Sequence, residues 1–190
     1  TYMMGADDGF LLSDRKFAGS DVLATSYALS QGIKKSGIPD IIICGKQTTD
    51  GDTAQVGAEL AEFLQIPHVT NVTKIMQITA ENITVELDLP TMAQVAELQF
   101  PCLITVEKDI YQPRLPSFRR MLNTKTRTVS VLSLADLEDT DENNYGLKGS
   151  PTKVQRVFPP DSDVVQEKWQ GQADELSTKL FKKLEELKFI

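Results

Sequence analysis

Hydrophobic and polar positions follow different periods along the chain, and these periods predict its elements. In the first third, residues 9–12 and 40–44 are apolar runs typical of strands, and residues 20–36 and 53–65 carry apolar side chains at helical spacing. Residues 41–44, Ile-Ile-Ile-Cys, show no polar alternation, which is typical of a strand buried on both faces of a parallel sheet. The order strand, helix, strand, helix therefore predicts an α/β fold with a parallel sheet and helices on both faces.

The middle of the chain is built from short segments, several of which alternate. Residues 83–89, Ile-Thr-Val-Glu-Leu-Asp-Leu, alternate between apolar and polar positions and predict a half-buried strand. Further strand-like segments occupy residues 68–72, 75–79, 93–100 and 102–107. We expect these five segments to form an antiparallel strand extension of the parallel sheet. A helix at 116–123 and another strand at 128–132 should follow.

The pattern changes again at Glu138. Residues 138–165 are rich in turn-forming residues and poorly periodic, which predicts an extended C-terminal arm. Residues 172–187 return to helical spacing, with one apolar side formed by Leu176, Leu180, Leu184 and Leu187. Such a helix has little core of its own, so we expect it to pack on another subunit; the alternative is that it folds back on its own domain.

The loop between the central strand and the next helix is the main candidate site. Residues 45–57 read Gly-Lys-Gln-Thr-Thr-Asp-Gly-Asp-Thr-Ala-Gln-Val-Gly. A buried strand that leads through a polar loop into a helix N-terminus favours anion binding, because that helix end carries free N–H groups and a positive partial charge. Asp50, Asp52 and Thr53 suit the helix cap, and Gly51 lets the backbone approach a ligand. The alternative is an ordinary strand-to-helix turn, since the spacing fits neither the Rossmann nor the Walker motif.

Composition excludes several classes of function. The net charge of −7 argues against nucleic acid as a partner. Only one histidine, His68, is present, which excludes catalytic triads and multi-histidine metal sites. Cys44 and Cys102 lie in apolar segments and predict buried free thiols, so we expect a cytoplasmic protein. No apolar run approaches the ~20 residues that span a bilayer, so we expect no membrane insertion. Residues 1–7 are typical of a helix end closed by Gly5.

Residues 45–57 resemble the nucleotide-binding loop of the electron transfer flavoprotein β subunit. Three further stretches resemble the same family in the same order, namely residues 13–26, 112–119 and 146–154, so the likeness covers essentially the whole chain. The family also implies a first strand-helix unit upstream of Thr1. It implies a nucleotide-binding α/β domain over 1–137 and a partner-docking arm with a C-terminal helix over 138–190. The cofactor-binding residues that it implies are Ile41, Gly45, Lys46, Gln47, Thr48, Thr49, Asp50, Gly51, Asp52, Thr53, Ala54, Gln55 and Val56.

The resemblance also bears on the cofactor. Family members that only carry electrons hold AMP in this subunit, whereas members that bifurcate electrons hold a second FAD. Residues 17–26 resemble the bifurcating group, and Arg15 would then place a positive charge near an anionic reduced flavin, unless it is a surface residue. We therefore expect FAD, with AMP as the alternative. The redox chemistry then belongs to the flavin, and no side chain of this sequence is expected to act as a catalyst.

The family further implies partners. We expect a heterodimer with an α subunit that takes electrons from NADH and passes them to ferredoxin or flavodoxin and to a flavin-dependent dehydrogenase of the acyl-CoA or lactate type. Leu147, with Tyr145 beside it, is the expected docking point for that dehydrogenase, unless it is an inconsequential exposed leucine. Gln112 stands where many relatives have glutamate before Pro-Arg. Arg114 either forms an ion pair across a subunit or domain boundary or belongs to a rigid connector, and the sequence leaves both alternatives open. The remaining alternatives are a non-bifurcating electron carrier and a non-redox nucleotide-binding regulator.

Overall fold

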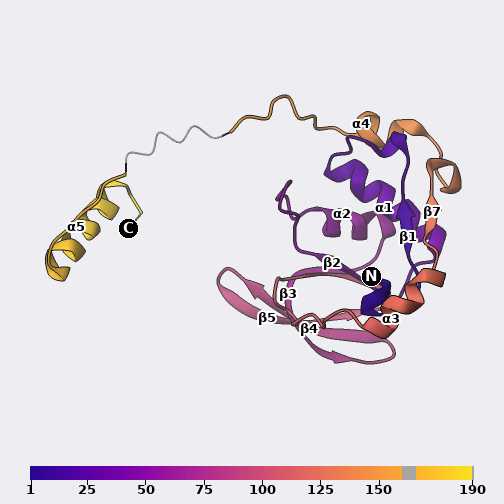
Figure 1. Ribbon diagram of the computed structural model, residues 1–190, viewed down its shortest axis with the longest axis horizontal. Coiled ribbons are helices and arrows are strands. Elements are labelled where there is room, and N and C mark those ends of the chain that lie inside the picture. The colour runs from indigo at the N-terminus through magenta and orange to yellow at the C-terminus, as the bar shows by residue number, and fades with distance from the viewer. Residues whose placement is uncertain (160–165, 190) are drawn as a thin grey trace. The chain divides into compact units, whose positions relative to one another are not determined.

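A mixed five-stranded sheet carries the larger core of residues 1–153. The computed structural model describes residues 1–159 and 166–189, which divide into two units, 1–153 and 154–190. In the first unit the strands lie in the order β2-β6-β3-β4-β5, and Figure 1 labels all of these strands except β6. Their bounds are β2 (Ile41–Gly45), β6 (Cys102–Val106), β3 (His68–Ile78), β4 (Asn82–Leu89) and β5 (Met92–Gln99).

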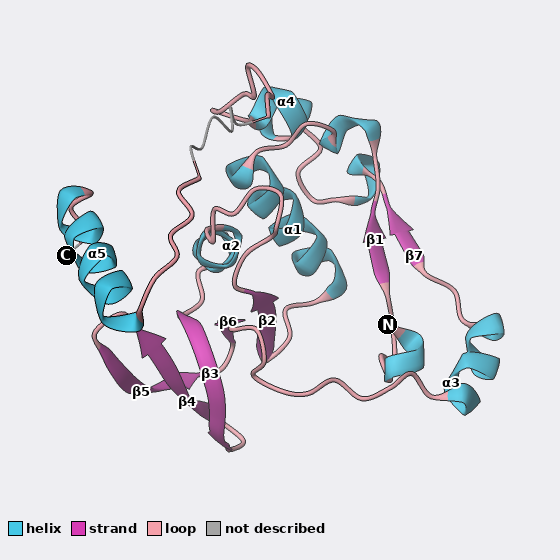
Figure 2. Ribbon diagram, turned by 60° about the vertical axis from the view of Figure 1, so that its left-hand side comes forward, coloured by secondary structure: helices cyan, strands magenta, loops and turns pink. Residues whose placement is uncertain are grey.

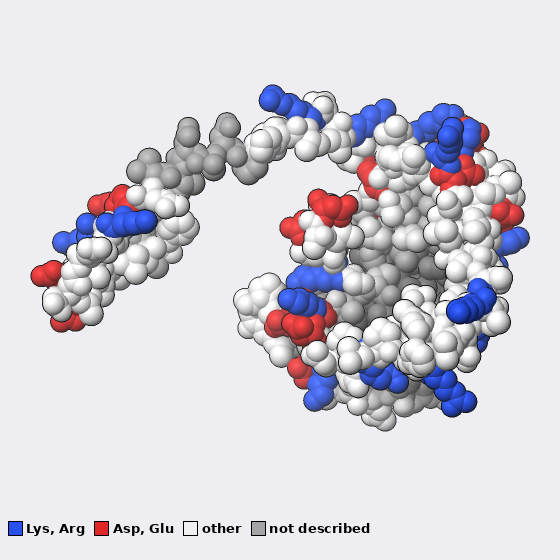
Figure 3. Space-filling model, viewed as in Figure 1, with Lys and Arg blue, Asp and Glu red and all other residues white. Residues whose placement is uncertain are grey.

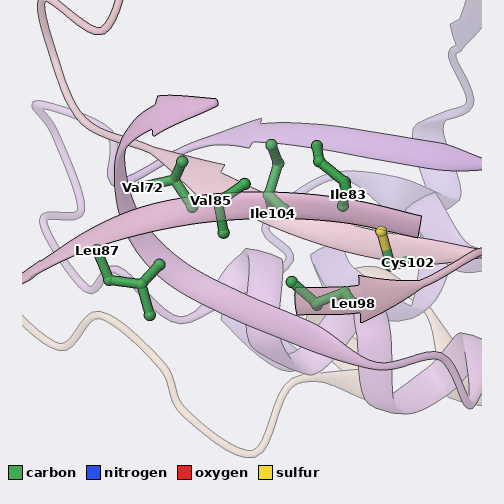
Figure 4. Close-up of a cluster of buried hydrophobic side chains, with 7 residues drawn as sticks. All are labelled: Val72, Ile83, Val85, Leu87, Leu98, Cys102 and Ile104. Atoms are coloured by element: carbon green, nitrogen blue, oxygen red, sulfur yellow. The ribbon is translucent and has the colours of Figure 1, made fainter. Parts of the chain in front are cut away.

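The sheet combines a parallel part with an antiparallel part. Strands β2, β6 and β3 are parallel, and β3, β4 and β5 form an antiparallel meander. Strand β4 alternates as predicted, with Ile83, Val85 and Leu87 buried. The α/β class with an antiparallel extension is therefore confirmed. Side chains of the meander and β6 form one core cluster, shown in Figure 4: Val72, Ile83, Val85, Leu87, Leu98, Cys102 and Ile104.

Two expectations about these strands are wrong. Residues 102–107 were expected in the antiparallel extension, but β6 lies between β2 and β3 and is parallel to both. Its residues 102–105 are all buried, which is the property of a central parallel strand. Residues 68–72 and 75–79 are one continuous strand, β3, in which two register shifts against β4 disturb the alternation.

Strand β2 is an edge strand in the part of the chain that the structure describes, not a strand buried on both faces. Ile42 is buried against α2 (Val56–Leu64) and α1 (Val22–Ser36), whereas Ile43 on the opposite face is 60% exposed. Both helices contribute to this one cluster, so within the described residues they cover the same face of β2.

A second, smaller sheet lies on the side of α1 that faces away from the five-stranded sheet (Figure 2). It pairs β1 (Phe10–Leu12) with β7 (Ser130–Leu132) in parallel, so β1 does not join β2 as expected. The side chain of Leu12 fills the space beside Gly32 of α1, where any Cβ would meet it at 2.7 Å. Strand β1 is therefore packed closely on the helix.

Short helices complete the first unit. Gly5, with φ of +117°, closes the 3₁₀ turn η1 (Tyr2–Met4), as the sequence predicts. Helix α1 is capped by Asp21 and ends at Gly37, and Ser117 caps α3 (Phe118–Asn123). The remaining short helices are η2 (Arg15–Phe17), η3 (Thr124–Thr126), η4 (Leu134–Asp136), η5 (Glu142–Asn144) and α4 (Gly146–Gly149).

Residues 138–153 are folded onto α1 rather than extended. Leu134, Leu137 and Tyr145 form a buried cluster with Ala28, and Phe17 and Tyr27 pack against it. The compact unit therefore continues to Lys153, past the predicted boundary at 137. These aromatic partners lie more than a hundred residues upstream, so local periodicity could not reveal them.

The second unit contains the predicted C-terminal helix, α5 (Ala173–Glu186). Lys183 forms an ion pair with Glu167 at 2.8 Å, and the Lys179 ammonium lies 4.6 Å from the Trp169 ring centroid. Leu180, Phe181 and Leu187 are exposed within the described residues. The part of the predicted arm at 160–165 lies outside the described residues.

Candidate functional site

The loop after β2 folds back on itself before the next helix begins. Lys46 extends the pairing of β2 with β6, because its N–H donates to the carbonyl oxygen of Val106 at 3.1 Å. A turn follows, in which the Asp52 N–H donates to the Thr48 carbonyl oxygen at 3.1 Å and the Gln47 amide donates to the Asp52 carboxylate. Asp52 and Ala54 both adopt positive φ, 50° and 54°.

Because of this loop conformation, α2 begins later than the predicted residue 53, and no side chain caps its first turn. The helix begins at Val56 with Gln55 at the cap position, and no side chain accepts from its N–H groups. The expectation that Asp50, Asp52 and Thr53 cap the helix is therefore wrong. Asp50 lies in the exposed turn, where hydrogen bonding by the Thr48 hydroxyl and the Gly51 N–H lowers the pKa of its carboxylate. Uncapped N–H groups at a helix start are a site that an anion can satisfy.

A cavity of about 360 Å³ opens between this loop, the start of α2 and α1. It brings together eight of the thirteen residues expected to bind a cofactor: Gly45, Lys46, Gln47, Thr48, Thr53, Ala54, Gln55 and Val56. Four more lining residues were missed by the sequence reasoning: Thr25, Leu29, Cys44 and Gly57. Thr25 and Leu29 are spaced by one helical turn on α1, a signal that marks a shared face but not what it faces.

Five expected residues do not line this cavity. Residues 49–52 form the exposed turn of the loop. Ile41 lies at the opposite end of β2 from Gly45, about 13 Å away at the rise of an extended strand. Ile41 instead packs against the core cluster of the meander. The loop is therefore divided between a cavity wall and a turn that faces solvent.

The cavity wall carries one paired cation. The Lys46 ammonium lies 2.7 Å from Glu107 Oε1, and both side chains are partly exposed. Glu107 follows β6, and its N–H donates to the carbonyl oxygen of Val72 at 2.9 Å, so the carboxylate is anchored to the sheet. An ammonium group at this wall favours a negatively charged ligand, while the neighbouring carboxylate moderates that attraction.

The second region of interest surrounds Leu147 in α4. Leu147 is 58% exposed and lies against Gly19, as expected for an accessible side chain. Tyr145 is only 1% exposed, and its hydroxyl donates to the Asp139 carbonyl oxygen at 2.6 Å. The Tyr145 ring therefore belongs to the interior, and burial raises its pKa. Arg15 is exposed and borders a hollow of about 290 Å³ beside Leu147.

The described residues contain no group of three His, Cys, Asp or Glu side chains arranged to hold a metal ion. Among the same residues, no helix combines the length and apolarity needed to cross a bilayer. Cys44 and Cys102 are both free, and burial raises the pKa of each thiol. Basic and acidic side chains are intermixed over the face of residues 1–153 seen in Figure 3.

Comparison with known proteins places these features in a family. The model of the electron transfer flavoprotein domain matches residues 1–137. The chain is 48% identical over 163 residues to the electron transfer flavoprotein subunit beta of Megasphaera elsdenii. This match covers 83% of this chain and 60% of the relative. It is 42% identical over 182 residues to the subunit of the same name from Thermoanaerobacterium thermosaccharolyticum, covering 95% of this chain and 69% of the relative.

A third relative carries a more specific name. The chain is 40% identical over 157 residues to the caffeyl-CoA reductase-Etf complex subunit CarD of Acetobacterium woodii, covering 83% of this chain and 59% of that protein. The chain thus spans about 60% to 70% of the length of these curated relatives. The matched domain and these identities, together with the loop at 45–57, show that the chain belongs to the electron transfer flavoprotein β-subunit family.

Proposed function

We propose that this chain binds an adenine nucleotide in the cavity at residues 45–57, as part of a β subunit that works with an α subunit. The observation that supports the proposal is the meeting of three features at one cavity. These are the carboxyl end of β2, the uncapped first turn of α2 and the Lys46 ammonium. A helix N-terminus and a cation both favour a phosphate group.

The cavity suits one mononucleotide. Its volume of about 360 Å³ falls near the lower end of the range for small-molecule sites, about 300–1,000 Å³. AMP and the AMP half of FAD share this moiety, so either would fit the residues present. Lys46, the Thr53 hydroxyl and the N–H groups around Val56 would hold the phosphate.

FAD is the cofactor that we propose, and electron bifurcation is the activity. When bound, a flavin supplies the hydride and single-electron chemistry, and the chain supplies placement and charge. The assembled complex would take electrons from NADH and deliver them to ferredoxin or flavodoxin and to a partner flavoprotein dehydrogenase. The name of the CarD relative, a subunit of a caffeyl-CoA reductase complex, supports an acyl-CoA reductase as that partner. Leu147 would be the contact point for it.

Cofactor release from the purified heterodimer tests this proposal. Heat denaturation followed by chromatography should recover two FAD per heterodimer. One FAD and one AMP would contradict bifurcation but support a nucleotide at this site, as in a simple electron carrier. Recovery of no adenine nucleotide from this subunit, even after incubation with AMP or FAD, would overturn the site itself. Thr53→Val serves as a matched variant, because it keeps the side-chain size and removes only the hydroxyl from the cavity wall.

A further inference from the structure

Asp21 connects α1 to the segment that carries Leu147. Its Oδ1 accepts from the Ala24 N–H at 3.1 Å, which caps the helix. Its Oδ2 accepts from both the N–H and the hydroxyl of Thr152, at 2.9 and 2.7 Å. The Asp21 N–H donates in turn to Ser150 Oγ at 2.8 Å. With the Thr25 N–H, which donates to the Asp21 carbonyl oxygen at 3.0 Å, this residue makes five hydrogen bonds, and three of them reach a segment about 130 residues further along the chain.

The same contacts fix α4. Ser150 is buried, and its hydroxyl donates to the Gly146 carbonyl oxygen at 2.6 Å. Gly146 has a φ of +57°, and a Cβ there would stand 2.2 Å from the Lys16 carbonyl oxygen. The backbone of α4 is therefore held against the chain that leads into α1. The position of Leu147, which lies between these anchored residues, depends on them.

Helix α1 also forms a wall of the nucleotide cavity. Thr25 and Leu29 line it, one and two turns beyond Asp21, which is about 6 and 12 Å along the helix axis. The side chain of Ser26, between them, is fully buried and donates to the carbonyl oxygens of Val22 at 2.8 Å and Val56 at 3.4 Å. The cavity and α4 are thus attached to one rigid element, at positions separated by a short stretch of helix.

We propose that Asp21 is a positioning residue that ties the Leu147 segment to the helix bordering the nucleotide cavity, so that the docking point and the cofactor site keep a fixed separation. This inference rests on the proposed function of both sites. A docking point on a loosely held loop would vary in its distance from the cavity, whereas attachment to a helix holds it constant.

Asp21→Ser isolates this role. Serine retains a capping oxygen for the Ala24 N–H, so α1 should keep its start. It removes the carboxylate oxygen that accepts from Thr152. Asp141→Ala is the matched control, because Asp141 accepts from the Asn143 N–H of η5 and, within the described residues, its carboxylate makes no hydrogen bond to α1.

Hydrogen exchange of the full chain with and without AMP is the readout. In the parent, the Gly149 N–H donates to the Tyr145 carbonyl oxygen at 3.0 Å, and saturating AMP should slow its exchange. Asp21→Ser should raise that exchange about tenfold and abolish the slowing by AMP, while AMP still binds and α1 amides keep their protection. Asp141→Ala should preserve both properties of Gly149.

Unchanged exchange of Gly149 in Asp21→Ser, or slowing by AMP that persists in it, would overturn the inference. Failure of AMP to bind the parent would instead count against the proposed nucleotide site. In that case the comparison without AMP still decides whether Asp21 holds the segment.

Discussion

Gly57 lies so close to Thr105 that a Cβ at position 57 would stand 2.4 Å from Thr105 Cγ2. Gly57 is in the first turn of α2, and Thr105 is buried in the central strand β6. The start of the helix, with the N–H groups that border the cavity, is therefore seated directly on the sheet. Any larger side chain at 57 must lift this turn or move the strand.

Gly57→Ala should accordingly lower the free energy of unfolding by about 1–3 kcal/mol, the usual cost of overpacking, despite the better helix propensity of alanine. Thr105→Ser removes the clashing methyl and keeps the oxygen that accepts from the Asn71 N–H at 3.3 Å. The double variant should therefore recover most of the loss caused by Gly57→Ala. Guanidinium denaturation of the four proteins measures this coupling, and simple additivity of the two changes would contradict it.

Elements with a strong local signal could be predicted from the sequence. The alternation in β4 and the capped, periodic α1 follow from residues that are neighbours in the chain. The place of β6 between β2 and β3 could not be predicted, because a short apolar run specifies burial but not its pairing partners.

The candidate site was predictable only in part for a related reason. The motif located the loop, but the positive φ angles at Asp52 and Ala54 decide which of its residues face the cavity and where α2 begins. Tyr145 illustrates the same limit. Its burial depends on the rings of Phe17 and Tyr27, whose centroids each lie 5.4 Å from its own, and which belong to another part of the chain.

Cys44 reports on occupancy of the cavity. Its free thiol is half-buried at the cavity wall, and burial raises its pKa, so a disulfide reagent should modify it slowly at neutral pH. AMP at ten times its dissociation constant should slow this reaction by about tenfold, since only about a tenth of the sites stay free. Cys102, which is fully buried, should react only on unfolding. A Cys44 rate that is insensitive to saturating AMP would place the nucleotide elsewhere.

Lys46 should contribute to phosphate binding and not to recognition of the nucleoside. Lys46→Gln removes the charge and should weaken AMP binding about tenfold, or about 1.4 kcal/mol, while adenosine binding stays the same. Glu107→Gln should strengthen AMP binding, because it removes the carboxylate that lies 2.7 Å from the ammonium. Isothermal titration measures both ligands. Equal losses of AMP and adenosine in Lys46→Gln would indicate a packing role.

Leu147 should contribute to partner binding without affecting the fold. Leu147→Ala removes a 58% exposed side chain and should weaken binding to the partner dehydrogenase about tenfold, as for an anchor that fills a pocket. Leu115, which is 90% exposed in the segment before α3, provides the control, because Leu115→Ala removes a similar apolar surface elsewhere. Surface plasmon resonance with the intact heterodimer measures both. Equal effects of the two substitutions would contradict a specific anchor.

Tyr27 should make the fold sensitive to alkaline pH. Burial first, and then the hydrogen bond of 2.6 Å to the Asp139 carboxylate, raises its pKa from 10.0 to about 12. Because the folded-state pKa exceeds the unfolded value, this contribution to stability is fully present below pH 10 and is lost as the pH rises toward 12, by at most about 1.4 kcal/mol per pH unit. In denaturation experiments over this pH range, the free energy of unfolding of Tyr27→Phe should decline less steeply than that of the parent. Asp139→Asn should lower the pKa of Tyr27, which a titration followed by phenolate absorbance measures. Equal slopes for the parent and Tyr27→Phe between pH 10 and 12 would contradict a raised pKa of Tyr27 in the folded protein.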